Sequence, residues 1–177
     1  MRETTQDLII ETASAFFAER GAWGTSLGDI AGNLGISKGT LYYHFSTKQA
    51  LINAVLERSV KRISDRLFAW VDTVKVGDDP VVPLEGLCDA LLADESLRVF
   101  IAVNGAAEPD SQLEADVDRA MNEWNVMIEV GSLRMEASAA AKMKRILAAV
   151  LPFICGLAAL NADGDYAKAA FTALVLG

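Results

Sequence analysis

The stretch LGISKGTLYYHFSTK, residues 34–48, concentrates the side chains with the most binding chemistry in this chain. It holds the only histidine of the sequence, two adjacent tyrosines and two lysines, namely His44, Tyr42, Tyr43, Lys38 and Lys48. Ammonium groups, tyrosine hydroxyls and imidazole can all bind phosphate oxygens. The question is whether the folded chain would present these groups together to an external anion.

Both lysines are predicted to lie where helices begin. Ser37 is a helix N-cap by type and position, which makes Lys38 the first residue of a helix. Ser46 and Gln49 have capping-box spacing, which makes Lys48 the second residue of the next helix. A cation at the positive end of a helix dipole costs roughly 0.3–1 kcal/mol. Both positions become favourable if a phosphate group lies against these helix ends.

The residues between the lysines favour close approach by a partner. Gly39 inside a helix costs roughly 1 kcal/mol relative to alanine, so we expect a ligand or backbone to pass near it. Thr40 has the short side chain that a helix in the DNA major groove presents to base edges. Leu41 and Phe45 are four residues apart and are expected to face the core. The alternative is a helix whose outward face is merely solvated.

The whole chain is predicted to be all-α, because apolar residues recur at helical spacing and no alternating strand pattern is found. Two short helices joined by a glycine turn make a helix-turn-helix within the N-terminal three-helix unit. About nine helices are predicted, near residues 5–20, 27–34, 38–45, 46–75, 84–93, 95–104, 111–130, 137–161 and 165–176.

Composition limits the class of protein. The 177 residues are 52% hydrophobic, enough for a sizeable core, and the two cysteines, Cys88 and Cys155, are too few and too far apart for a disulfide framework or a zinc site. We expect a cytoplasmic protein, since the first residues do not resemble a signal peptide and no stretch has the length of a membrane span. The net charge is −8, but residues 1–50 carry only −1 of it. Acidity therefore lies mainly outside the lysine-bearing stretch.

Residues 8–55 resemble the DNA-binding domain of the TetR family of bacterial regulators. The resemblance rests on the spacing of Ala13, Phe16, Phe17 and Gly21, and on the segments TSLGDIA, LGISKGTLYYHF and KQAL. It implies a DNA-binding domain over residues 1–48 and a ligand-binding and dimerisation domain over residues 49–177.

The resemblance also assigns roles to ten residues. Phosphate contacts fall to Thr25, Ser26, Ser37, Lys38, Tyr42, His44 and Lys48. Base contacts fall to Gly39, Thr40 and Tyr43. The chain departs from the family pattern at Ala22, where an aromatic residue is usual and Trp23 follows instead, and at Gly28, where a longer side chain is common.

The rest of the chain resembles the family more weakly, in its helix order and in a VGSLR segment similar to the turn before the dimerising helices. The run from Ile146 to Leu160 is apolar all round, which suits a helix buried both in its own core and against a partner subunit, or else the central helix of a monomer. With the last helix it predicts a dimer interface of Leu147, Val150, Ile154, Leu157, Phe171 and Leu174.

A small-molecule cavity or a plain core would both account for a second apolar set. Its members are Trp70, Leu91, Phe100, Ile101, Met121, Trp124, Met127 and Phe153. The basic residues of the long fourth helix are expected to be solvated: Arg58, Lys61, Arg62 and Arg66.

The predicted function is sequence-specific transcriptional regulation by a homodimer that reads a near-palindromic operator in double-stranded DNA. Repression relieved by an unknown small-molecule ligand is the form that the resemblance implies. An enzyme is disfavoured, because one histidine and the lack of metal-binding or phosphate-loop motifs leave little catalytic equipment. No catalytic residue, metal site or cofactor is predicted. The remaining alternative is a helical binding protein whose helix-turn-helix contacts other proteins.

Overall fold

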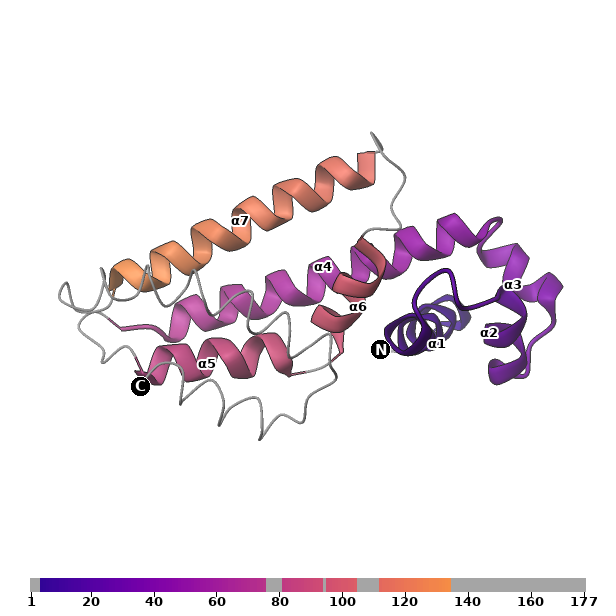
Figure 1. The fold of residues 1–177 in the computed structure, drawn as a ribbon, viewed down its shortest axis with the longest axis horizontal. Coiled ribbons are helices and arrows are strands. Elements are labelled where there is room, and N and C mark those ends of the chain that lie inside the picture. Colours follow the sequence, from indigo (N-terminus) through magenta and orange to yellow (C-terminus); the bar gives the residue numbers. More distant parts are fainter. Residues whose placement is uncertain (1–3, 76–80, 94, 105–111, 135–177) are drawn as a thin grey trace.

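Helix α4 is the element on which the other described helices assemble. The structure is a computed structural model that describes residues 4–75, 81–93, 95–104 and 112–134. Helix α4 (Lys48–Thr73) packs against α1 (Thr5–Arg20), α5 (Val81–Leu92), α6 (Ser96–Asn104) and α7 (Gln112–Arg134). At its N-terminal end lie α2 (Leu27–Leu34) and α3 (Lys38–His44), with α1 beside them (Figure 1).

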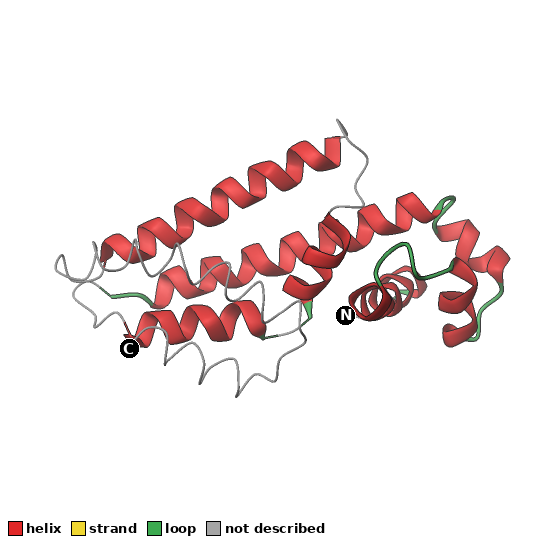
Figure 2. Ribbon diagram, viewed as in Figure 1, coloured by secondary structure: helices red, strands yellow, loops and turns green. Residues whose placement is uncertain are grey.

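All regular structure in the described part of the chain is helical, as predicted (Figure 2). Seven of the predicted helices are present, and the two predicted after residue 135 lie outside the described residues. None of the helices in the described ranges is long and apolar enough to cross a membrane.

The ends of the first helices follow from their caps. Thr4 and Ser26 form capping boxes with the acids three residues later, Asp7 and Asp29. Gly21 and Gly35 follow α1 and α2 with positive φ angles of 74° and 65°, a conformation that L side chains rarely adopt. These four predicted boundaries are confirmed.

Later boundaries differ from the predictions by a few residues. Thr47, not Ser46, caps α4, and its hydroxyl accepts a hydrogen bond from the Ala50 N–H at 3.0 Å. Helix α5 begins three residues earlier than expected, because Pro83 falls in its first turn, where a missing N–H costs nothing. Helix α7 continues to Arg134, so the VGSLR segment is helical and not the expected turn.

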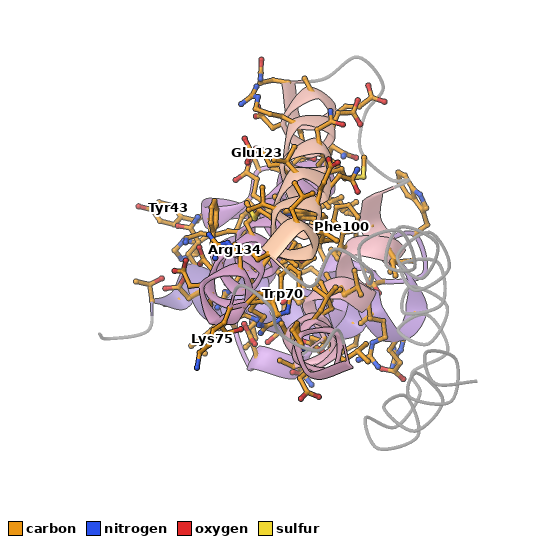
Figure 3. The ribbon with its side chains drawn as sticks, turned by 90° about the vertical axis from the view of Figure 1, so that its left-hand side faces the viewer. Tyr43, Trp70, Lys75, Phe100, Glu123 and Arg134 are labelled. Atoms are coloured by element: carbon orange, nitrogen blue, oxygen red, sulfur yellow. The ribbon has the colours of Figure 1, made fainter. Side chains whose placement is uncertain are left out.

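Near its C-terminal end, helix α7 packs Gly131 against the Trp70 indole of α4. A Cβ at Gly131 would lie 2.5 Å from the Trp70 ring, so only glycine lets α7 approach α4 this closely. The Trp70 indole N–H donates to the Pro83 carbonyl at 2.6 Å, and Arg134 donates to the Val71 carbonyl at 2.8 Å. Three helices are thereby fixed around one buried ring, which Figure 3 shows lying among them.

A continuous core connects both ends of the molecule. Apolar residues at helical spacing along α4 and its C-cap are all buried: Leu51, Val55, Ile63, Leu67, Trp70 and Val74. Leu41 and Phe45 are buried as expected, and they attach the short α3 to that core. Phe16 of α1 is only partly buried, and the Arg20 guanidinium lies 4.9 Å from its ring centroid.

The prediction that the basic residues of α4 are merely solvated is wrong for two of them. Arg58 and Arg62 both pair with the Glu11 carboxylate, at 2.9 and 3.1 Å, and Arg58 also donates to the Asp7 carbonyl. Lys61 pairs within its own helix with Asp65. The arginines tie the middle of α4 to α1, a long-range contact that helical spacing alone does not reveal.

Candidate nucleic-acid interface

Lys38 and Lys48 are the first residues of α3 and α4, with hydroxyl caps immediately before them. Lys48 is thus one position nearer the helix end than predicted. Helices α1 and α2 have an acid in the first turn, whereas α3 and α4 have none. The positive ends of α3 and α4 therefore gain positive charge where the other two helices carry compensating negative charge.

Neither lysine forms an ion pair within the described part of the chain. Lys38 is exposed and lies across the start of α2, since a Cβ at Gly28 would be 3.2 Å from its Cε and 3.4 Å from its Nζ. A larger residue at position 28 would require the flexible end of Lys38 to shift by a few tenths of an ångström. Lys48 is half-buried.

The predicted base-reading side chains are open to solvent. Gly39 and Thr40 are exposed, and Tyr43 is 85% exposed, projecting beyond the helices in Figure 3. Tyr42 is 50% exposed, and the half-buried His44 meets the Tyr43 ring edge to face, with centroids 5.2 Å apart. One outward face of α3 therefore combines a bare backbone, a hydroxyl and aromatic rings.

The three hydroxyl residues assigned to phosphate differ in their freedom. Ser26 and Ser37 are exposed N-caps, and each accepts a backbone N–H of its own helix. Thr25 is only 2% exposed, and its hydroxyl donates to the Gly21 carbonyl at 3.1 Å. The Thr25 side chain thus holds the turn before α2 and is not presented to solvent.

These elements enclose an open groove of about 670 Å³. It runs between the turn before α2, the first turns of α2 and α3, and the start of α4. We call it the α2–α4 groove, and it is lined by Trp23, Gly24, Thr25, Ser26, Leu27, Gly28, Asp29, Lys38, Tyr42, Ser46, Thr47 and Lys48. It brings together five of the ten residues assigned to DNA. The other five do not line it and lie on α3 or at its N-cap: Ser37, Gly39, Thr40, Tyr43 and His44.

The lone acid of the groove lining, Asp29, is engaged by its own helix cap. The Ser26 backbone N–H and hydroxyl donate to its carboxylate at 2.9 and 2.8 Å and lower its pKa, with smaller effects from Arg20 and Lys38. The carboxylate is therefore charged at neutral pH and satisfied locally. Its charge offsets one of the two lysines and leaves the start of α4 without an acid.

Sequence reasoning missed Trp23 as part of this surface. The indole is 73% exposed, and the Lys48 Nζ lies 5.5 Å from its ring centroid, within cation–π range. The departure from the family pattern at Ala22 could have indicated this. Ala22 takes the buried position after Gly21, and the aromatic Trp23, one residue later, is left exposed.

The apolar residues predicted for a ligand site belong to the core of the second half. Trp70, Leu91, Phe100, Trp124 and Met127 are buried, and Ile101 and Met121 pack against them. The Trp124 indole N–H donates to Ser64 Oγ at 2.7 Å, and its ring meets Phe100 edge to face. Phe153 and all six predicted dimer residues, from Leu147 to Leu174, lie outside the described residues.

The profile of the family described as "Bacterial regulatory proteins, tetR family" matches residues 9–55. The HTH-type transcriptional repressor KstR2 of Mycobacterium tuberculosis is 39% identical to the chain over 80 residues. That alignment covers 45% of this chain and 38% of KstR2, so the chain spans less than two thirds of this curated relative.

Solved structures extend the similarity to the whole fold. A TetR-family transcriptional regulator from Bordetella parapertussis superimposes with a TM-score of 0.74 at 20% identity, covering 99% of this chain and 95% of that one. AibR, solved with isovaleryl coenzyme A and operator DNA, gives a TM-score of 0.70 at 18% identity and covers 94% of this chain and 95% of its own. At such identities these structures establish a common fold.

Gly39 offers a test that separates folding from binding. Apart from its own helix backbone, a Cβ at Gly39 would meet only Ser37 Oγ, at 3.6 Å, which is ordinary contact. Gly39→Ala should therefore stabilise the protein by about 0.5–1 kcal/mol through helix propensity. If a duplex lies against α3, the same methyl group should weaken binding to DNA. Urea unfolding and a gel shift measure the two effects.

Gly32→Ala is the matched control, because Gly32 is an exposed helical glycine of α2 with nothing within 4 Å of its added Cβ. It should stabilise the protein similarly and leave DNA binding unchanged. Equal DNA affinity of the Gly39→Ala variant and the unchanged protein would remove α3 from the interface.

Proposed function

We propose that this chain is a member of the tetR family of bacterial regulatory proteins and a transcriptional repressor that binds an operator in double-stranded DNA. The observation that carries the proposal is the pair of lysines at the starts of α3 and α4, in helices without a first-turn acid. Phosphate oxygens would satisfy both the lysines and the free N–H groups there.

The proposed interface divides phosphate contacts from base contacts. Lys38, Lys48 and the hydroxyls around the α2–α4 groove hold the sugar–phosphate backbone and set the register of the protein on the duplex. The exposed face of α3, with Gly39, Thr40 and Tyr43, enters the major groove and contacts base edges. Phosphate contacts then supply affinity for any duplex, and α3 supplies sequence preference.

The active species is proposed to be a homodimer. Two copies of α3 about 34–36 Å apart would meet successive major grooves on one side of B-DNA, which predicts a near-palindromic operator. An operator placed over a promoter would exclude polymerase. The acidic remainder of the protein would face away from the duplex, in keeping with the concentration of negative charge outside residues 1–50.

The second half of the chain is proposed to bind a small molecule that releases the operator. Helix α4 has the contacts to carry the signal, since it joins the Trp70 and Trp124 core to α1 through Arg58, Arg62 and Glu11. Displacement of α4 would also move α1, α2 and α3 and change the separation of the two copies of α3. A tenfold loss of operator affinity requires about 1.4 kcal/mol of coupling.

Substitution of Tyr43 and Lys48 tests the interface. Tyr43→Ala should reduce the preference for the duplex upstream of the chain's own gene over a scrambled duplex, because a base contact is lost. Lys48→Met should weaken binding to both duplexes by the same factor, because a phosphate contact is independent of sequence. Competition gel shifts measure both quantities.

Lys61→Met is the control for the lysine substitution, since Lys61 lies farther along α4 and pairs with Asp65. It should leave binding to both duplexes unchanged. If Tyr43→Ala and Lys48→Met bind both duplexes as the unchanged protein does, the assigned face is wrong, and a protein-binding role for the helix-turn-helix becomes the better account.

Ligand release is tested by thermodynamic reciprocity. A compound that binds the form with low operator affinity must raise the Tm of the free protein and must also weaken its binding to the operator. A thermal-shift screen of small organic acids, acyl-coenzyme A thioesters and quaternary amines supplies candidates, and each is then titrated into the protein–DNA complex. Compounds that raise the Tm and leave operator affinity unchanged would refute release by that route.

A further inference from the structure

Trp23 stands on a rigid turn, not on a loose loop. A Cβ at Gly24 would clash with the Arg20 carbonyl oxygen, so the chain after Trp23 passes tightly against the end of α1. The Thr25 hydroxyl closes the same turn on the Gly21 carbonyl. The backbone that carries the indole is therefore tightly held, although the side chain is 73% exposed and buries little of its apolar surface.

A single exposed aromatic side chain is ordinary on protein surfaces. Two further observations distinguish this one. The Lys48 ammonium lies 5.5 Å from the centroid of the ring, and Trp23 and Lys48 both line the α2–α4 groove. Because the lysine would otherwise sample many rotamers, the ring restricts the positions that its charge can occupy.

We propose that Trp23 is a DNA-contacting residue that packs on the sugar–phosphate backbone and positions Lys48 for the adjacent phosphate. This inference rests on the proposed function, because it assigns a further residue to the same duplex. The partner surface is the deoxyribose and phosphate chain and not the bases, since Trp23 lines the groove that holds Lys38 and Lys48, whereas Gly39, Thr40 and Tyr43 do not line it. An aromatic face suits an apolar sugar edge, and the indole N–H is a donor for a phosphate oxygen.

The exposure of the Trp23 indole makes the contact measurable by fluorescence. Trp70 and Trp124, the other two tryptophans of the chain, are 3% and 9% exposed. A neutral quencher such as acrylamide in solution should therefore reach mainly Trp23. In the full-length protein, saturation with the upstream duplex should reduce the quenchable part of the fluorescence, and Trp23→Phe should abolish that part in the free protein. Unchanged quenching at saturating duplex would overturn the proposed contact.

A double-mutant cycle with Lys48 tests the positioning role. Trp23→Ala should weaken binding to the upstream duplex by about three- to tenfold when Lys48 is present. In the Lys48→Met background the same change should cost less than about twofold, because no ammonium remains to be positioned. Trp23→Phe keeps a ring for the cation and should retain most of the affinity. Equal losses in both backgrounds would show that the ring does not act through Lys48.

Phe68→Ala is the matched control, since Phe68 is also an exposed aromatic residue, 57% exposed, but lies far along α4. It should change neither quenching nor DNA affinity. Thermal unfolding of each variant verifies that the fold is retained. If the unchanged protein binds no duplex, the proposed function itself fails. If it binds and the Trp23 variants bind equally well, only this inference fails.

Discussion

The attachment of α3 to the core is the constraint on which the rest of the structure depends. A helix of seven residues has no stability of its own in water, so α3 persists because Leu41 and Phe45 are buried in the core and because α3 packs against α2. With that side committed to the core, the opposite face can remain exposed and chemically diverse. Lys38, Gly39 and Tyr43 each contribute little to helix stability or to burial. The packing of Leu41 and Phe45 stabilises α3 in spite of them.

The second constraint is that α4 belongs to both halves of the molecule. Its first residue, Lys48, lines the groove. Its middle is held to α1 by two arginines that pair with Glu11, and near its end Trp70 packs against Gly131 of α7. The ion pairs are partly exposed, so each contributes little to stability by itself. The ion pairs couple the positions of the two helices, because a displacement of α4 also moves α1 and the helices packed on it.

The sequence predicted the features that depend on local chemistry. Capping boxes at Thr4 and Ser26, the glycine ends at Gly21 and Gly35, and the buried stripe of α4 all follow from short spacings, and the structure confirms them. Contacts between distant residues could not be found that way. The Glu11 pairing with Arg58 and Arg62, the Gly131 packing on Trp70 and the buried Thr25 hydroxyl join positions whose proximity only the tertiary fold creates. The site assignments themselves stay predictions until DNA binding is measured.

The salt dependence of DNA binding tests the central claim most directly, because phosphate neutralisation releases condensed counterions. The measurement compares the slope of log affinity against log salt for the unchanged protein and for the variant carrying both Lys38→Met and Lys48→Met. We expect a steep negative slope for the unchanged protein and a slope shallower by about 0.9 for each phosphate contact that the two lysines make. Identical slopes, or salt-independent binding by the unchanged protein, would contradict the claim that duplex phosphates meet these two helix ends.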